Sequence, residues 1–313
     1  MMKKNMWSRW ILALAVVWPC MAAAHDRVRE KENFDFDWKF ILNADDRANA
    51  GMQVSETGWQ DVQLPHDWSI SLNFDPKLSG SNGHLPGGIG WYRKTFRVDK
   101  KDKGRRIAVL FDGIYSHSDV YVNGQHLGFR PYGFCYQEYD LTPYLNYGAE
   151  NVLAVRVNNP LEHDSVARWY TGAGIYRHAW LVKTAEVHVA SYGTYVTTPV
   201  VTAERAEVRV RTSVANEAER TKTLSVRQQI TDGEGRTVVQ SGKQALQVAA
   251  GQTADTEHTL EIPRPQLWDT EHPYLYTLHT TIYDGRKLVD TYETVFGVRT
   301  CEFTPDCGFL LNG

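Results

Sequence analysis

Cysteine is scarce in this 313-residue chain, which has only Cys20, Cys135, Cys301 and Cys307. No CxxC or HExxH spacing occurs, so the sequence does not indicate a metal site. Cys20 lies in an N-terminal apolar segment, and the other three cysteines are too few and too scattered for a disulfide framework. Cys301 and Cys307 could pair with each other or remain buried free thiols. We expect neither a metal nor a cofactor.

Charge of one sign is also lacking. The chain carries 34 Lys and Arg against 37 Asp and Glu, a formal net charge of -3. Proteins that bind nucleic acid or anionic membranes usually show a basic excess on one face or in one segment. The near balance of charge therefore gives no reason to expect a nucleic-acid partner.

One apolar run stands out, at the N-terminus. A positive start, an apolar run and a small-residue cleavage pattern follow one another there, in Lys3, Lys4 and Arg9, residues 10–18, and Ala22, Ala23 and Ala24. This order is typical of a secretory signal peptide over residues 1–24. A membrane anchor is the alternative, but a spanning helix needs about 20 apolar residues and this run is shorter. We expect cleavage after Ala24, no membrane span, and a secreted, periplasmic or extracellular protein.

Long amphipathic helices are missing after residue 24. Short runs of β-branched and aromatic residues alternate instead with turn signals, which is typical of β-sandwiches. These runs are residues 93–98, 106–111, 152–157 and 179–182, then 207–214, 224–230, 237–240, 259–262 and 275–282. Asn123-Gly124 and Asp284-Gly285 predict tight hairpin turns, because both dipeptides tolerate positive φ.

The chain changes character near residue 190. Trp, Tyr and Gly are dense before it and the loops are long, whereas cleaner alternating strands follow it. About seven short strands in about 110 residues suit an immunoglobulin-like sandwich. Two all-β domains are therefore expected.

Five groups of motifs follow one another along the chain. They are residues 36–40 with 59–68 (WQDVQLPHDW); 88–96 (GIGWYRKTF); 111–145, containing DVYVNGQHLG; 168–181 (RWYTGAGIYRHAWL); and 265–278 with 296–300 and 308–313. Any one of them alone indicates only a sandwich. In this order and spacing, covering almost the whole chain after the leader, they resemble family 2 of the glycoside hydrolases, the β-galactosidase and β-glucuronidase group.

The resemblance implies a fold and an activity. It implies a jelly-roll, galactose-binding-like domain over residues 25–189, an immunoglobulin-like domain over 190–300, and the start of a truncated (β/α)₈ barrel in 301–313. Family members are retaining glycosidases whose two glutamates lie in the barrel, roughly 5 Å apart. A barrel needs roughly 250 residues. We therefore expect the non-catalytic N-terminal portion of an exported β-galactosidase-like enzyme, with no catalytic residue and no activity of its own.

The resemblance also suggests where a sugar would be contacted. In the family, the loop before the GIYR motif reaches the substrate, and β-galactosidases place an acidic residue there. This chain has Arg168 at that position, with Asp164 as a nearby acid; Arg168 could instead bind a carboxylated or sulfated sugar. The alternative is that Arg168 and Trp169 only hold the two domains together. The expected partner is an oligosaccharide or glycan, and the substrate-binding candidates are Asp164, Arg168, Trp169, Tyr170 and His84.

Other interpretations remain open. His84, in the glycine-rich loop 79–90, could simply be a solvated loop residue. Asn216-Glu217 repeats the Asn-Glu pair of the family's acid/base, but its position between predicted strands favours a turn. A free-standing carbohydrate-binding module and an immunoglobulin-like adhesion protein are the alternative functions. Faces that pack on the barrel in the family would be bare here, so self-association is expected.

Overall fold

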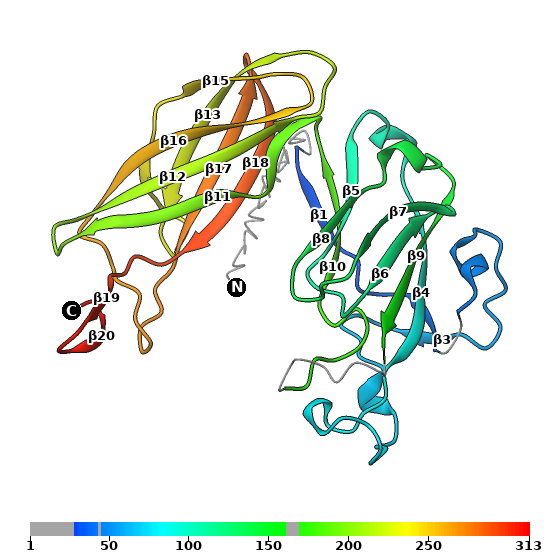
Figure 1. The fold of residues 1–313 in the computed structure, drawn as a ribbon. Coiled ribbons are helices and arrows are strands. Elements are labelled where there is room, and N and C mark those ends of the chain that lie inside the picture. The colour runs from blue at the N-terminus through cyan, green and yellow to red at the C-terminus, as the bar shows by residue number, and fades with distance from the viewer. Residues whose placement is uncertain (1–27, 43–44, 161–168) are drawn as a thin grey trace, which may run out of the picture.

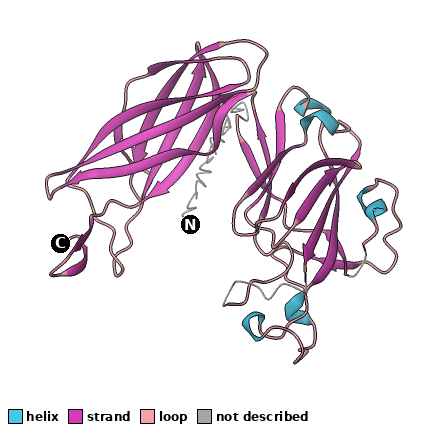
Figure 2. Cartoon of the chain, in the orientation of Figure 1, coloured by secondary structure: helices cyan, strands magenta, loops and turns pink. Residues whose placement is uncertain are grey.

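Two β-sandwiches stand side by side in the computed structural model, which describes residues 28–42, 45–160 and 169–313 (Figure 1). Within these residues, helix is limited to short 3-10 turns (Figure 2). The predicted all-β fold is therefore confirmed. The predicted signal peptide, residues 1–24, lies outside the described residues.

The first sandwich packs a six-stranded antiparallel sheet on a four-stranded one. The larger sheet has the order β3-β2-β4-β9-β6-β7, with β3 (Gln60–Val62), β2 (Trp38–Leu42), β4 (Gly88–Arg97), β9 (Glu150–Asn159), β6 (Ser118–Val122) and β7 (Gln125–Arg130). The smaller sheet has the order β1-β10-β5-β8, with β1 (Glu30–Asn33), β10 (Ala179–Thr184), β5 (Arg106–Phe111) and β8 (Gln137–Asp140).

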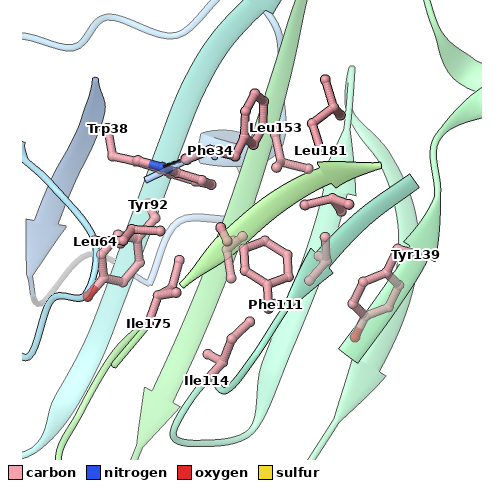
Figure 3. Close-up of a cluster of buried hydrophobic side chains, with 14 of the residues drawn as sticks. Phe34, Trp38, Leu64, Tyr92, Phe111, Ile114, Tyr139, Leu153, Ile175 and Leu181 are labelled. Atoms are coloured by element: carbon pink, nitrogen blue, oxygen red, sulfur yellow. Dashed lines mark hydrogen bonds between the residues drawn. The ribbon is translucent and has the colours of Figure 1, made fainter. Parts of the chain in front are cut away.

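Aromatic side chains from both sheets fill the space between them (Figure 3). Trp38, Tyr92 and Phe111 are each 0% exposed. The rings of Trp38 and Tyr92 meet edge to face, with centroids 6.4 Å apart. Burying each such side chain contributes about 1.5–3 kcal/mol to folding. Many of the chain's aromatic residues therefore stabilise the fold by filling this core.

The outer face of the six-stranded sheet is covered as well. Trp91 and Ala154 are 0% exposed, and they pack with Tyr121 against Ala50 of the β2–β3 connection. Arg93, only 1% exposed, donates to the carbonyl oxygens of Asn49 and Gly51 in that connection. This cover explains why β9 is buried on both faces.

The second sandwich is immunoglobulin-like, as predicted. One sheet has the order β11-β12-β16 and the other β14-β13-β17-β18, with β15 paired to β13. The strands are β11 (Val187–Val201), β12 (Arg205–Asn216), β13 (Lys222–Thr231), β14 (Thr237–Gln240), β15 (Gln244–Val248), β16 (Gln252–Pro263), β17 (Tyr276–Asp284) and β18 (Lys287–Phe296). Strict alternation of buried and exposed residues along β16 reflects one face on the core and one in water.

Both predicted hairpins form, one of them with a shifted turn. Asn123 (φ 51°) and Gly124 (φ 85°) join β6 to β7, as predicted. In the second hairpin Asp284 still pairs with Lys287, so the two turn residues are Gly285 (φ 62°) and Arg286. The prediction of Asp284-Gly285 as the turn was wrong by one residue, because Asp284 stays in β17 and pairs with Lys287.

A small hairpin, β19 (Cys301–Thr304) with β20 (Gly308–Leu311), follows the second sandwich. Cys301 lies opposite Leu311 at its open end, whereas Cys307 lies at the turn. The two thiols therefore sit at opposite ends of the hairpin, and both are free. Both are also exposed, so the alternative of buried thiols was wrong for this pair.

The two sandwiches are joined by ion pairs as well as by the chain. Arg29 donates from Nε and Nη2 to the two carboxylate oxygens of Asp290 on β18, at 3.0 and 2.8 Å. Arg106 on β5 pairs with Glu217 at 2.8 Å. Asn216 uses its side-chain amide to close the turn, donating to Arg220, Val248 and Ala249 carbonyls. Asn216 thus ends β12 and Glu217 begins the β12–β13 connection, where it makes an interdomain contact; the predicted turn starts one residue later than expected.

A buried histidine at this junction makes stability depend on pH. His188 is 5% exposed, and burial, together with Arg106 and Arg29, lowers its pKa from 6.5 to about 3. The folded state therefore takes up fewer protons than the unfolded state between these two pH values. Stability supplied by neutral His188 is present above pH 6.5 and is lost as pH falls toward 3, by about 1.4 kcal/mol per pH unit.

We expect His188→Asn to flatten this acid limb, because the variant has no imidazole to protonate on unfolding. Urea unfolding from pH 7 to pH 4 measures the free energy of unfolding of the wild type and the variant. The matched control is His84→Asn, since His84 is exposed. An unchanged slope in the His188 variant would contradict the assignment.

Candidate functional site

A cavity of about 500 Å³ opens among the loops at one end of the first sandwich. The β3–β4 connection, which carries η2 (Ser69–Ser71) and η3 (Gly80–Asn82), extends beyond this end (Figure 1). The cavity is lined by Leu78, Ser79, Asn82, Leu85, Gly87, Tyr115, Ser116, His117, Pro131, Tyr132, Gly133, Phe134, Asn159, Pro160, Trp169 and Thr171. Four separate loop segments thus contribute to one concave surface.

Aromatic rings form much of its wall. Phe134 packs against Tyr115 and Tyr132, with ring centroids 5.1 and 5.8 Å away. Tyr132 is 61% exposed and Trp169 is 60% exposed, so their ring surfaces face solvent at the cavity. Amphipathic rings of this kind give broad apolar contact together with a polar edge.

Polar groups, including the imidazole of His117, complete the lining. Amides come from Asn82 and Asn159, and hydroxyls from Ser79, Ser116 and Thr171. Among the described lining residues there is no Lys, Arg, Asp or Glu. Aromatic rings with a few amide and hydroxyl groups are typical of small-molecule sites.

Asp67 fixes the loop that carries Trp169. Its Oδ1 accepts hydrogen bonds from the backbone N–H groups of Ser69 and Ala173, each at 3.0 Å. Its Oδ2 accepts the hydroxyl of Tyr170 at 2.5 Å. One carboxylate therefore ties the β3–β4 connection to the segment 170–173.

The same segment needs two glycines. Gly172 and Gly174 have φ of 78° and 116°, where side chains are disfavoured. A Cβ on Gly174 would lie 2.2 Å from the hydroxyl of Tyr92. Thr171, between them and Trp169, donates from its backbone N–H and its hydroxyl to Asn82 Oδ1.

The five predicted site residues differ in where they lie. Asp164 and Arg168 lie outside the described residues. Trp169 lines the cavity, and Tyr170 lies beside it, where burial and then Asp67 raise the pKa of its hydroxyl. His84 is exposed, with φ 57°, and its Nδ1 lies 2.8 Å from the carbonyl oxygen of Leu78; it is not among the lining residues.

The sequence did not single out Asp67, Asn82 or Tyr115. Asp67 lies in the LPHDW motif that carries part of the family resemblance, so a signal was present but its role was not. Asn82 lies in the glycine-rich loop, and the sequence does not show that it reaches Thr171, 89 residues further along the chain. Tyr115 belongs to a strand connection whose direction the sequence pattern does not reveal.

Over residues 28–42, 45–160 and 169–313, His, Cys, Asp and Glu side chains do not gather in threes at a point where they could hold a metal ion. Within the same residues, every helix is too short or too polar to cross a membrane.

Curated relatives match almost the whole chain. It is 41% identical over 302 residues to the β-galactosidase BoGH2A of Bacteroides ovatus, covering 94% of this chain and 34% of that protein. It is 34% identical to a β-glucuronidase of Formosa agariphila, covering 91% of this chain and 31% of that protein. The chain thus spans about a third of the length of these relatives.

Solved structures agree. A glycosyl hydrolase family 2 member from Bacteroides cellulosilyticus superimposes with a TM-score of 0.83 at 37% identity, covering 90% of this chain and 37% of that one. A β-glucuronidase of the same family gives a TM-score of 0.83 at 33% identity, covering 91% and 32%.

Family models assign both sandwiches. Residues 32–185 match the sugar binding domain of glycosyl hydrolases family 2, and residues 187–299 match a second model described as glycosyl hydrolases family 2. The two matches cover nearly all of the described chain. The protein belongs to glycoside hydrolase family 2, and its two sandwiches are the family's sugar-binding domain and immunoglobulin-like domain.

Proposed function

We propose that this chain is the non-catalytic, glycan-contacting portion of an exported retaining β-glycosidase that hydrolyses O-glycosidic bonds. The observation that carries the proposal is the cavity, where Trp169 and Tyr132 present rings beside the amides of Asn82 and Asn159. In this proposal both catalytic glutamates belong to a (β/α)₈ barrel, and the cavity places the sugar at the barrel's mouth.

The proposed substrate is a β-galactoside rather than a β-glucuronide. A glucuronide carries a carboxylate, which is usually met by Arg or Lys. The polar side chains of the described lining are amides, hydroxyls and the imidazole of His117. The name of the Bacteroides ovatus relative, a β-galactosidase, supports the same choice.

Export and self-association complete the proposal. The leader pattern of residues 1–24 supports secretion to the periplasm or the cell exterior. Phe303 and Phe309 of the terminal hairpin are 81% and 53% exposed, and their tilted rings contact each other with centroids 5.0 Å apart. Exposed apolar surface of this kind supports contact with a second copy.

The decisive experiment expresses the reading frame from its own locus, including the codons that follow Gly313. We expect hydrolysis of p-nitrophenyl β-D-galactoside, with the β-anomer as first product in proton NMR, and much slower hydrolysis of the β-D-glucuronide. In the active product Trp169→Ala should raise KM about tenfold through lost ring contact. Phe74→Ala is the matched control, because Phe74 is 74% exposed on the β3–β4 connection and does not line the cavity.

A frame that stops at Gly313, with glycan binding by the chain itself, would replace the enzyme proposal by the free-standing binding module. Preference for the glucuronide would contradict the argument from the uncharged lining.

Removing the Asp67 carboxylate should loosen the loop that carries Trp169. In Asp67→Asn the side-chain oxygen can still accept one hydrogen bond, but the charge-assisted bond to the Tyr170 hydroxyl is lost. We expect hydrogen exchange of residues 169–173 to quicken several-fold, with the core strands unchanged. Asp75→Asn is the control, because the Asp75 carboxylate accepts a hydrogen bond from the nearby Lys77 N–H at the surface. Equal protection in both variants would contradict the role of Asp67.

The terminal hairpin should drive weak association of the chain. We expect sedimentation velocity to show a concentration-dependent shift toward dimer, and Phe303→Ser with Phe309→Ser to abolish it. Because both rings are exposed, the double variant should keep its thermal stability. A chain that stays monomeric at all concentrations would contradict this part of the proposal.

A further inference from the structure

A second cavity, of about 390 Å³, lies in the groove between the two sandwiches. Leu110 and Val182 come from the four-stranded sheet of the first sandwich, with Arg29 and Lys31 at its edge. The opposite wall belongs to the second sandwich and consists of Ser191, Tyr192, Thr291, Tyr292 and Glu293. The groove is distinct from the loop-end cavity, since the two share no lining residue.

Asp112 holds two aromatic rings at this groove. Its Oδ2 accepts the indole N–H of Trp180 at 2.9 Å, and its Oδ1 accepts the hydroxyl of Tyr192 at 3.3 Å. The Tyr192 ring also packs on Tyr136 of the first sandwich, with centroids 4.6 Å apart. The ring of Tyr192 therefore reaches across the domain boundary and is fixed on the far side.

The backbone at Tyr192 is held in an unusual conformation. Its φ is 54°, a left-handed conformation that is disfavoured for a residue with a large side chain. It lies in the irregular part of β11, between the paired residues Val189 and Thr194. A Cβ on the next residue, Gly193, would lie 2.6 Å from the carbonyl oxygen of Ala190, so only glycine fits there. The Tyr192 N–H donates to the hydroxyl of Tyr292 at 3.2 Å.

Tyr192 remains 55% exposed, although its hydroxyl, its N–H and one edge of its ring are all engaged. Backbone strain that the surroundings maintain at an exposed aromatic residue is typical of binding sites. The surrounding contacts thus hold this exposed ring in place although the backbone conformation is disfavoured.

The polar groups of the groove are mixed and balanced in charge. Arg29 is neutralised by Asp290, and Glu293 lies 3.3 Å from His279. The ammonium of Lys31 lies over the ring of Trp180, at 4.0 Å. Ser191 and Thr291 add hydroxyls. Donors and acceptors therefore surround a ring surface without a net charge that would select an ion.

We propose that the groove between the sandwiches is a second carbohydrate site, which binds a neutral sugar unit of an oligosaccharide against the Tyr192 ring. The sugar hydroxyls meet Lys31, Ser191, Thr291 and Glu293. Its volume lies in the range of about 300–1,000 Å³ that small-molecule sites occupy. A ligand there contacts both sandwiches, so binding also fixes their relative position.

The test is a titration of the full chain with lactose and with cellobiose, followed by two-dimensional amide NMR. We expect millimolar binding, with shifts at the amides of Tyr192 and Thr291. Tyr192→Ala should weaken this binding about tenfold, because the stacking surface is removed. The matched control is Tyr195→Ala, because Tyr195 lies on the same strand, is 61% exposed and does not line the groove.

A second variant keeps the test independent of the strained backbone. Ser191→Trp fills the groove from a half-buried position and should abolish the shifts while the thermal stability is kept. Trp169→Ala should leave the groove shifts unchanged, which separates this site from the loop-end cavity. Absence of groove shifts with both sugars, or wild-type affinity in Ser191→Trp, would overturn the proposal.

Discussion

The packing of two sheets around one continuous aromatic core is the constraint on which the rest of the first sandwich depends. Trp38, Tyr92 and Phe111 are completely buried between the sheets, so the strands cannot slide without opening the core. Because strand ends are fixed, the loops that leave them begin at fixed points. Tyr92 shows the link directly: its hydroxyl lies 2.8 Å from His66 Nδ1 and against the backbone of Gly174.

Above this rigid base, hydrogen bonds rather than apolar contacts shape the loop end. Asp67 and Asn82 each join two segments that are far apart in sequence, and both do so by accepting hydrogen bonds. Such loops can hold exposed rings in place without burying them. Hydrogen bonds to Asp67 and Asn82 fix the residues that follow Trp169. The Trp169 ring itself stays exposed, so a ligand can contact it.

The boundary between the sandwiches has a different physical character. It relies on charge, through Arg29 with Asp290 and Arg106 with Glu217, and on rings that cross from one side to the other. Burial raises the pKa of the Asp290 carboxyl, although Arg29 acts in the opposite direction. The attraction within a buried ion pair largely offsets the cost of removing both charges from water, so the pair adds little net stability. Removing one partner leaves an uncompensated charge, so the pair specifies the geometry of the junction. A fixed junction is also what gives the groove beside Tyr192 a defined shape.

Sequence alone determined the fold class, the succession of two sandwiches and the family, because these follow from the alternation of residues 207–214, from turn dipeptides such as Asn123-Gly124, and from the order of the motifs. It also placed Trp169 and Tyr170 on the relevant loop. Only the tertiary structure brought Asp67, Asn82 and Tyr115 to that loop, moved the second hairpin turn to Gly285 and Arg286, and separated Cys301 from Cys307. The physical reason is that local patterns report the period and direction of the backbone, whereas contacts between distant loops, strand register and the junction of two domains depend on how the sheets pack in space.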